Sequence, residues 1–170
     1  NKWYTLTNIT PNISDAGEWV TPYVLDPSDN QTIYVGYRNV YRSTNRGTNW
    51  SQISNLSIPS DENGLTSIAI AESNNQVMYI SNKSRIWRTT DGGANWNEIT
   101  SNLPSVGWWF NTVLSSRDLT YINIKSNDPN TVWITLGGYD SHNIYESTDG
   151  GNSWTNISSG LPNIPTMCVV

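Results

Sequence analysis

A short pattern that occurs three times along the chain most strongly constrains what these 170 residues can fold into. The copies are Ser43-Thr-Asn-Arg-Gly-Thr-Asn-Trp50, Thr89-Thr-Asp-Gly-Gly-Ala-Asn-Trp96 and Ser147-Thr-Asp-Gly-Gly-Asn-Ser-Trp154. Self-similarity of this kind indicates a repeat architecture, in which each copy belongs to one supersecondary unit. The unit length follows from the final tryptophans, since Trp50 and Trp96 are 46 residues apart.

Short apolar runs upstream of each copy predict the strands of each unit. They span 19–25, 32–36 and 39–42 in the first unit, 66–71, 76–80 and 85–88 in the second, and 120–125, 131–135 and 143–146 in the third. Each run alternates or is briefly apolar and ends at Asn, Asp, Gly or Pro, as strands do. A further strand is expected to start just before each tryptophan. Four short strands in about 46 residues are typical of a propeller blade, so the predicted fold class is an all-β propeller segment of three four-stranded blades.

The repeated pattern has the chemistry of a hairpin turn. Asp91 and Asp149 are expected to accept hydrogen bonds from backbone N–H groups, and the paired glycines to supply positive φ. The first copy has Asn45 and Arg46 at the corresponding places, which predicts a looser or differently bonded turn. The residues assigned to these turns are Ser43, Asn45, Gly47, Trp50, Thr89, Asp91, Gly93, Trp96, Ser147, Asp149, Gly151 and Trp154.

At these residues the chain resembles the Asp-box, or BNR-repeat, family, whose pattern is Ser/Thr-x-Asp-x-Gly-x-x-Trp. Members form β-propellers and include sialidases, xyloglucan-degrading glycoside hydrolases, sortilin-type receptors and a photosystem assembly factor. The resemblance covers nearly the whole chain and is specific for the fold, but not for function. It implies that the Asp box joins the third and fourth strands of a blade, away from the face where the enzymes bind substrate. The three tryptophans are then core anchors.

The repeats organise the whole chain into one propeller segment. We expect blades at 19–54, 65–100 and 119–158, preceded at 1–10 by the last strand of an earlier blade and followed at 164–170 by the first strand of another. A closed propeller needs at least four blades. Residues 1–170 are therefore expected to be part of a larger chain, whose remaining blades, or another chain, close the ring.

Composition excludes several classes of partner and site. Nine Lys and Arg residues against fourteen Asp and Glu give a net charge of -5, which disfavours nucleic-acid binding. No run approaches the roughly 18 apolar residues of a membrane span. The single cysteine, Cys168, excludes an internal disulfide and a thiolate-rich zinc site, and no cofactor is implied. Few charges, many Asn and Thr, and no disulfides favour an extracellular or cell-surface protein.

Two enlarged loops in the third unit are the candidate ligand site. The 104–119 loop stretches the distance from Trp96 to Trp154 to 58 residues, and 137–142 lengthens another connection that should lie on the same rim. Aromatic planes there would stack on sugar rings, and a few polar groups would orient a ligand. The candidates are Trp108, Trp109, Arg117, Asp118, Tyr139, Asp140 and His142. Alternatively, Trp108 and Trp109 begin an inner strand, as Trp19 is expected to do.

No catalytic set is identified. The resemblance to sialidases implies three arginines, but Arg42, Arg46 and Arg88 lie in or beside Asp boxes, where structural roles are expected. Asp118 and Asp140 could form a glycosidase-like carboxylate pair.

No metal site is predicted either. His142 is the only histidine, so a multi-histidine centre is excluded. The Asp26-Pro-Ser-Asp29 turn suits either calcium or a simple hairpin loop, and the loop is the simpler interpretation.

Three functions therefore remain open. The leading hypothesis is a non-catalytic extracellular module that binds a carbohydrate or protein ligand within a larger secreted or surface protein. The second is part of a glycoside hydrolase, sialidase-like or xyloglucanase-like, whose other catalytic residues lie outside this segment. The third is a structural scaffold of a surface or secretion assembly.

Overall fold

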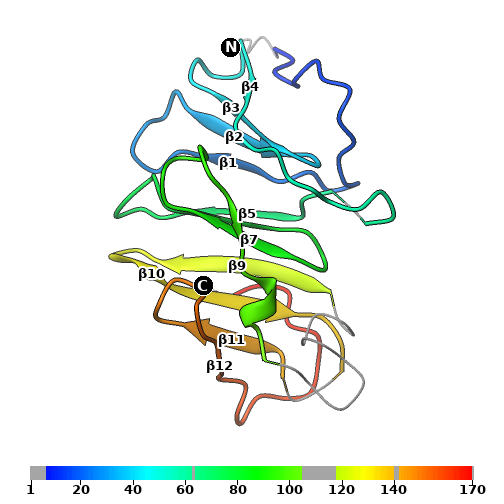
Figure 1. Ribbon diagram of the computed structural model, residues 1–170, viewed down its shortest axis with the longest axis vertical. Coiled ribbons are helices and arrows are strands. Elements are labelled where there is room, and N and C mark those ends of the chain that lie inside the picture. The colour runs from blue at the N-terminus through cyan, green and yellow to red at the C-terminus, as the bar shows by residue number, and fades with distance from the viewer. Residues whose placement is uncertain (1–6, 63, 105–117, 140–141, 170) are drawn as a thin grey trace, which may run out of the picture.

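The computed structural model of the chain describes residues 7–62, 64–104, 118–139 and 142–169. Within these ranges it contains three antiparallel sheets of four strands, stacked beside one another from the N-terminal to the C-terminal part of the chain (Figure 1). Each sheet takes its strands in sequence order, so every neighbouring pair is joined by a short connection. This meander is the arrangement of a propeller blade, and the predicted all-β propeller fold is confirmed.

The third and fourth strands have the same lengths in all three blades, whereas the first two strands are longer in blade 3. Blade 1 contains β1 (Tyr23–Leu25), β2 (Ile33–Gly36), β3 (Val40–Ser43) and β4 (Ser51–Gln52). Blade 2 contains β5 (Ser67–Ile70), β6 (Met78–Ser81), β7 (Ile86–Thr89) and β8 (Asn97–Glu98), followed by the 3-10 helix η1 (Thr100–Asn102). Blade 3 contains β9 (Leu119–Lys125), β10 (Asp128–Leu136), β11 (Ile144–Ser147) and β12 (Thr155–Asn156).

The core lies between the blades. One cluster of buried side chains joins blades 1 and 2 and includes Tyr34, Met78 and Ile80. A second joins blades 2 and 3 and includes Tyr79 and Ile134. The first strand of blade 2, β5, contacts both β1 and β9, so the first strands lie along a common inner edge. Because both faces of β6 pack against other blades, all four of its residues are buried, unlike the half-exposed strands of a lone sheet.

Two strand boundaries differ from the sequence prediction. The fourth strands begin after each tryptophan rather than before it, because the tryptophan still belongs to the turn. The Trp50 and Trp96 indoles point to earlier parts of the chain, where they donate to the Ile9 and Ile53 carbonyls. The run at 19–25 forms a strand only from Tyr23. Before it, the Thr21 hydroxyl donates to the Glu18 carbonyl at 2.9 Å, and Trp19 is fully exposed. The proposed equivalence of Trp19 to an inner-strand residue is therefore wrong.

The segments expected to belong to neighbouring blades form no strand in the described residues. Residues 7–10 are irregular, and the Ile9 carbonyl accepts a hydrogen bond from the Trp50 indole at 3.0 Å. At the other end, the Thr166 carbonyl accepts from the Thr120 hydroxyl at 2.6 Å, which places 164–169 along β9. The assignment of both segments to further blades remains a prediction.

Candidate functional site

The three Asp-box turns share one hydrogen-bond network. In the second box, the Thr89 hydroxyl donates to Asp91 Oδ1 at 2.8 Å, and the backbone N–H of Asn95 donates to the same oxygen at 2.8 Å. The backbone N–H of Gly93 donates to the Thr89 hydroxyl at 3.1 Å. Gly92 and Gly93 have φ of 70° and 95°, the left-handed region that glycine adopts without strain. The turn chemistry expected from the sequence is confirmed.

The first box keeps this network despite its altered sequence, so the expectation of a different turn is wrong. Asn45 Oδ1 accepts hydrogen bonds from the Ser43 hydroxyl at 2.9 Å and from the Asn49 N–H at 2.8 Å. An amide oxygen accepts hydrogen bonds in the same geometry as a carboxylate oxygen. Arg46, in the place of the first glycine, adopts φ of 57°.

Each box also contacts an isoleucine from an earlier part of the chain. Gly47 lies against Ile9, Gly93 against Ile53, and Gly151 against Ile99. A Cβ added at any of these glycines would lie within 2.9 Å of the isoleucine side chain, which is too close for real Cβ contacts. The second glycine is therefore required for its positive φ and for the close approach of two blades.

The box tryptophans differ in how they meet the preceding blade. Trp96 is half-buried and its indole N–H donates to the Ile53 carbonyl at 3.0 Å. Trp154 is buried, but its indole nitrogen has no hydrogen-bond partner among the described residues. The core-anchor interpretation therefore holds fully for Trp154, whereas Trp96 also closes the floor of a groove.

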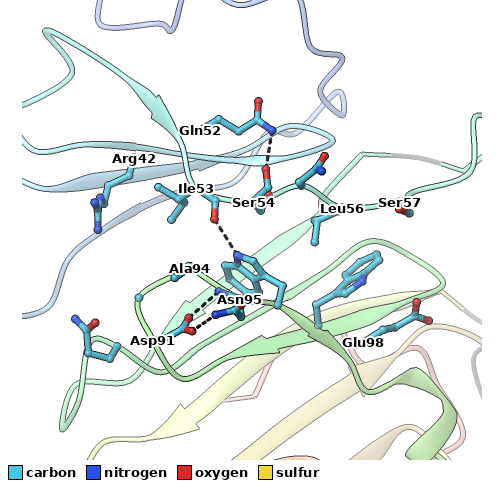
Figure 2. Close-up of a pocket in the computed structure, with 16 residues that line it drawn as sticks. Arg42, Gln52, Ile53, Ser54, Leu56, Ser57, Asp91, Ala94, Asn95 and Glu98 are labelled. Carbon is cyan, nitrogen blue, oxygen red and sulfur yellow. Dashed lines mark hydrogen bonds between the residues drawn. The ribbon is translucent and has the colours of Figure 1, made fainter.

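This groove, of about 820 Å³, lies between the outer parts of blades 1 and 2 (Figure 2). One wall is the segment that follows β4, and the other is the Asp box of blade 2. Trp87 and Trp96 supply aromatic surface, and Arg42 and Glu98 lie toward opposite ends in Figure 2. The lining residues are Arg42, Gln52, Ile53, Ser54, Asn55, Leu56, Ser57, Gln76, Trp87, Asp91, Gly92, Gly93, Ala94, Asn95, Trp96 and Glu98.

Both carboxylates of the groove are held in structural contacts. Hydrogen bonds from the Asn95 side chain, the Asn95 backbone and Thr89 lower the pKa of Asp91 to about 2. Glu98 accepts from Arg85 at 3.1 Å, and that arginine also pairs with Glu62 at 2.9 Å. A general acid must hold a proton near its working pH. Asp91 therefore does not hold a proton at neutral pH.

The candidate residues of blade 3 are only partly described. Trp108, Trp109, Arg117 and Asp140 lie outside the described residues. Asp118 forms an ion pair with Lys83 at 3.6 Å, across the boundary between blades 2 and 3. Tyr139 is 83% exposed, and His142 is half-buried.

One backbone contact brings the two enlarged loops of blade 3 together. The Gly137 N–H donates to the Asp118 carbonyl at 2.9 Å, so the end of one loop meets the start of the other. That they form a ligand site remains a prediction.

The Asp26–Asp29 turn is a hydrogen-bonded hairpin loop. Asp26 is buried and accepts from the Ser28 N–H at 2.9 Å, from the Tyr34 hydroxyl at 3.1 Å and from the Asn75 side chain of blade 2 at 3.2 Å. Burial acts to raise the pKa of Asp26, but these hydrogen bonds outweigh it and lower the pKa. No cluster of three or more potential metal ligands occurs in the described part of the chain.

Sequence reasoning missed the groove, although a signal for it exists. From Ile53 to Leu56 is three positions, whereas the matching connections Ile99–Leu103 and Ile157–Leu161 each take four. This one-residue difference is much smaller than the insertions in the loops of the third repeat. The ligand site was predicted in blade 3 because of those insertions.

Comparisons with known proteins agree with the fold. A family model described as "Sortilin, neurotensin receptor 3" (Sortilin-Vps10) matches residues 38–160, well over half of the chain. A xyloglucanase of Paenibacillus sp is 28% identical over 165 residues, which cover 79% of this chain and 15% of that protein. A xyloglucanase of Hypocrea jecorina is 23% identical over 188 residues, which cover 89% of this chain and 22% of that protein. The chain thus spans less than a quarter of the length of these curated relatives.

Solved structures show the same fold. The GH74 xyloglucanase from Xanthomonas campestris matches with a TM-score of 0.60 and 19% identity, over 83% of this chain and 23% of that one. YCF48 bound to D1 peptide matches with a TM-score of 0.53 and 16% identity, over 83% of this chain and 45% of that one.

No helix in the described residues is long and apolar enough to cross a membrane.

Proposed function

The chain belongs to the Sortilin-Vps10 family, and from this premise we propose that it is a non-catalytic propeller segment that binds a carbohydrate or protein ligand within a larger extracellular protein. The observation that carries the proposal is the groove between blades 1 and 2, whose two carboxylates are already engaged by the fold. A groove with aromatic floor, amide side chains and a cation offers the mixed lining that ligand sites have.

Binding can be tested in the full-length protein with one groove-filling variant. Asn55 is exposed at the groove wall, so Asn55→Trp should fill part of the groove without disturbing the core. Ser101 holds the matching position after β8 and is also exposed, so Ser101→Trp is the control. The ligands are a glycan array, which includes xyloglucan oligosaccharides, and a displayed library of random heptapeptides.

The proposal requires the wild-type protein to bind a member of either set, with binding reduced at least about tenfold by Asn55→Trp and unchanged by Ser101→Trp. Absence of binding to both sets contradicts it, as does a ligand that binds equally to the Asn55→Trp variant.

A second binding surface is the rim of blade 3, where Tyr139 is 83% exposed next to the loop that pairs with Asp118. A sugar stacked there would lose an aromatic platform in Tyr139→Ala. Glycan binding that survives Asn55→Trp but is lost in Tyr139→Ala would place the ligand on this rim instead of in the groove.

The xyloglucanase relatives favour one alternative, in which the parent protein is a glycoside hydrolase. In that case Asp118, paired with Asp140, is the proposed carboxylate of this segment. Xyloglucan incubated with the full-length protein would then release new reducing ends, and Asp118→Asn would lower kcat at least about a hundredfold, as loss of an acid–base group does. A binding module releases none.

A further inference from the structure

The groove exists because one connection in blade 1 is a residue shorter than its counterparts. Ser54, Thr100 and Ser158 are equivalent, since each hydroxyl accepts a backbone N–H from the third strand of its blade, at 2.8, 3.0 and 2.9 Å. Beyond Thr100 the chain forms η1 and reaches Leu103. Beyond Ser54 it continues directly to Leu56, whose N–H donates to Asn39 Oδ1 at 2.9 Å.

Between blades 2 and 3 the longer connection fills the corresponding place. The Asn102 side chain donates to the carbonyl of Gly151, in the next Asp box, at 2.9 Å. Leu103 is 3% exposed and packs in the core cluster that contains Trp154. An Asn–Leu pair of the chain itself therefore occupies the space between one blade and the Asp box of the next.

Between blades 1 and 2 the chain's own Asn–Leu pair is Asn55–Leu56: Leu56 packs against the core cluster of these blades, Asn55 is exposed, and the place that Asn102 takes beside the next Asp box is open. Gly93, the counterpart of Gly151, lines the groove, and its carbonyl accepts no hydrogen bond within the described part of the chain. Without the turn, the Ile53 carbonyl is free to accept the Trp96 indole N–H, which fixes that ring in the floor. Leu56 is only half-buried, so apolar surface remains available beside it.

We propose that this groove takes a short polypeptide segment of a partner protein that carries an Asn–Leu pair, and that the Asn of this segment takes the place that Asn102 takes in the next interblade space. This inference rests on the proposed binding function and names the class of ligand. The amide of the partner donates to the Gly93 carbonyl, and its leucine packs on Leu56 and Trp96.

The cation at one end of the groove supports a polypeptide over a sugar. Arg88 of blade 2 donates to Asn130 of blade 3 at 2.6 Å, whereas its counterpart Arg42 contacts the Tyr34 hydroxyl and forms no ion pair with a carboxylate among the described residues. An acidic side chain or chain terminus would pair with it. The Trp87 ring offers little surface for sugar stacking, because Trp87 is only 5% exposed.

The probe is a peptide with the chain's own sequence from Glu98 to Pro104, blocked at both ends and labelled with a fluorophore. Fluorescence anisotropy measures its binding to the full-length protein. We expect saturable binding that Asn55→Trp weakens at least about tenfold and that Ser101→Trp leaves within about twofold. Replacing the peptide's Asn by Ala should weaken binding about fivefold, the effect of one hydrogen bond; this change leaves the protein untouched, so it does not depend on how variants fold.

Three results would overturn the inference: no saturable binding at millimolar peptide, equal binding to the Asn55→Trp variant, or equal binding of the Ala peptide. If a glycan binds in the groove and the peptide does not, the inference fails while the proposed binding function stands. If neither binds, both fail.

Discussion

At the scale of single residues, the Asp boxes show that the side-chain oxygen matters more than its charge. Asn45 accepts the same two hydrogen bonds as Asp91 and Asp149 at the matching positions. The turn therefore needs an acceptor two residues after the Ser or Thr, and a carboxylate is one of two ways to supply it.

A dependence of stability on pH follows from the two charged boxes. The Ser153 side chain and backbone and the Ser147 hydroxyl lower the pKa of Asp149 to about 2, and Asp91 has the same shift from the ordinary value of 3.8. A carboxyl group whose pKa is lower in the folded state stabilises the fold above pH 3.8, and this contribution is lost as the pH falls toward 2. We expect Tm to fall over that range.

The matched variant is Asp91→Asn with Asp149→Asn, because Asn45 shows that asparagine keeps the main hydrogen bonds of the turn. Its Tm should fall less between pH 4 and pH 2 than that of the wild type, as followed by thermal unfolding. An identical fall in both proteins would show that other carboxyl groups control acid stability.

The glycines of these turns differ from an exposed turn glycine in their surroundings. Gly151 has φ of 85° and a Cβ there would lie 2.5 Å from Ile99 Cδ1, whereas Gly160 has φ of 82° and nothing within 4 Å. Gly160→Ala should cost about 1–2 kcal/mol, the strain of a left-handed residue. Gly151→Ala should cost about 1–3 kcal/mol more, since it also overpacks the interface. Urea unfolding measures both; equal costs would contradict the steric argument.

At the scale of elements, the connection after the fourth strand decides whether an interblade space is filled. In blade 2, the Asn102 N–H of η1 donates to the Ile99 carbonyl at 3.2 Å. The Trp154 indole N–H therefore has no hydrogen bond to that carbonyl. In blade 1, the shorter connection leaves the Ile53 carbonyl for Trp96. One residue of length thus changes the hydrogen bonding of a tryptophan in the next blade.

Restoring that residue should close the groove. A graft that replaces 54–57 with Thr-Ser-Asn-Leu-Pro, the sequence of 100–104, gives blade 1 the longer connection of blade 2. We expect a backbone N–H of the new turn to donate to the Ile53 carbonyl. The filled groove should then no longer bind ligand. The Trp96 indole N–H should exchange with solvent faster, as measured by NMR with labelled tryptophan. Unaltered exchange and binding would show that connection length does not determine the groove.

At the scale of the whole molecule, neighbouring blades are joined by repeated contacts of a few kinds. Ile53 and Ile99, which follow the fourth strands of blades 1 and 2, pack against the next Asp box. Polar contacts cross the same kind of boundary: the Tyr79 hydroxyl donates to the Pro129 carbonyl at 3.1 Å. Stability in such an array depends on the interfaces between neighbours as well as on each unit.

Ile99→Ala should therefore loosen two blades at once. Ile99 is 7% exposed and its Cδ1 lies under Gly151 of blade 3, so its truncation should cost about 2–5 kcal/mol. Hydrogen–deuterium exchange should rise in peptides from both β8 and the Asp box at 147–154, whereas the exposed control Ser101→Ala should change neither. Faster exchange confined to blade 2 would contradict coupling through this contact.

The sequence by itself determined the blades, because the evidence for them is local. Strand alternation, paired glycines and a turn acceptor act within a few residues, so the recurrence of the Asp box predicts four-stranded units and their hydrogen-bonded turns. The same reasoning failed at Trp19 and at the starts of the fourth strands, where a side chain's contact with its own turn or with the preceding blade decides the backbone.

Only the tertiary structure decided where blades leave space between them. Ile53 and Gly93 are 40 positions apart in the sequence, and whether they enclose a groove depends on how two blades pack and on a connection one residue shorter than its counterparts. The enlarged loops of blade 3 attract attention in the sequence because insertions are visible there. A missing residue is less conspicuous, and its consequence appears only when the neighbouring Asp box is in place. Repeats specify the blades locally, and the site depends on the departures from the repeat.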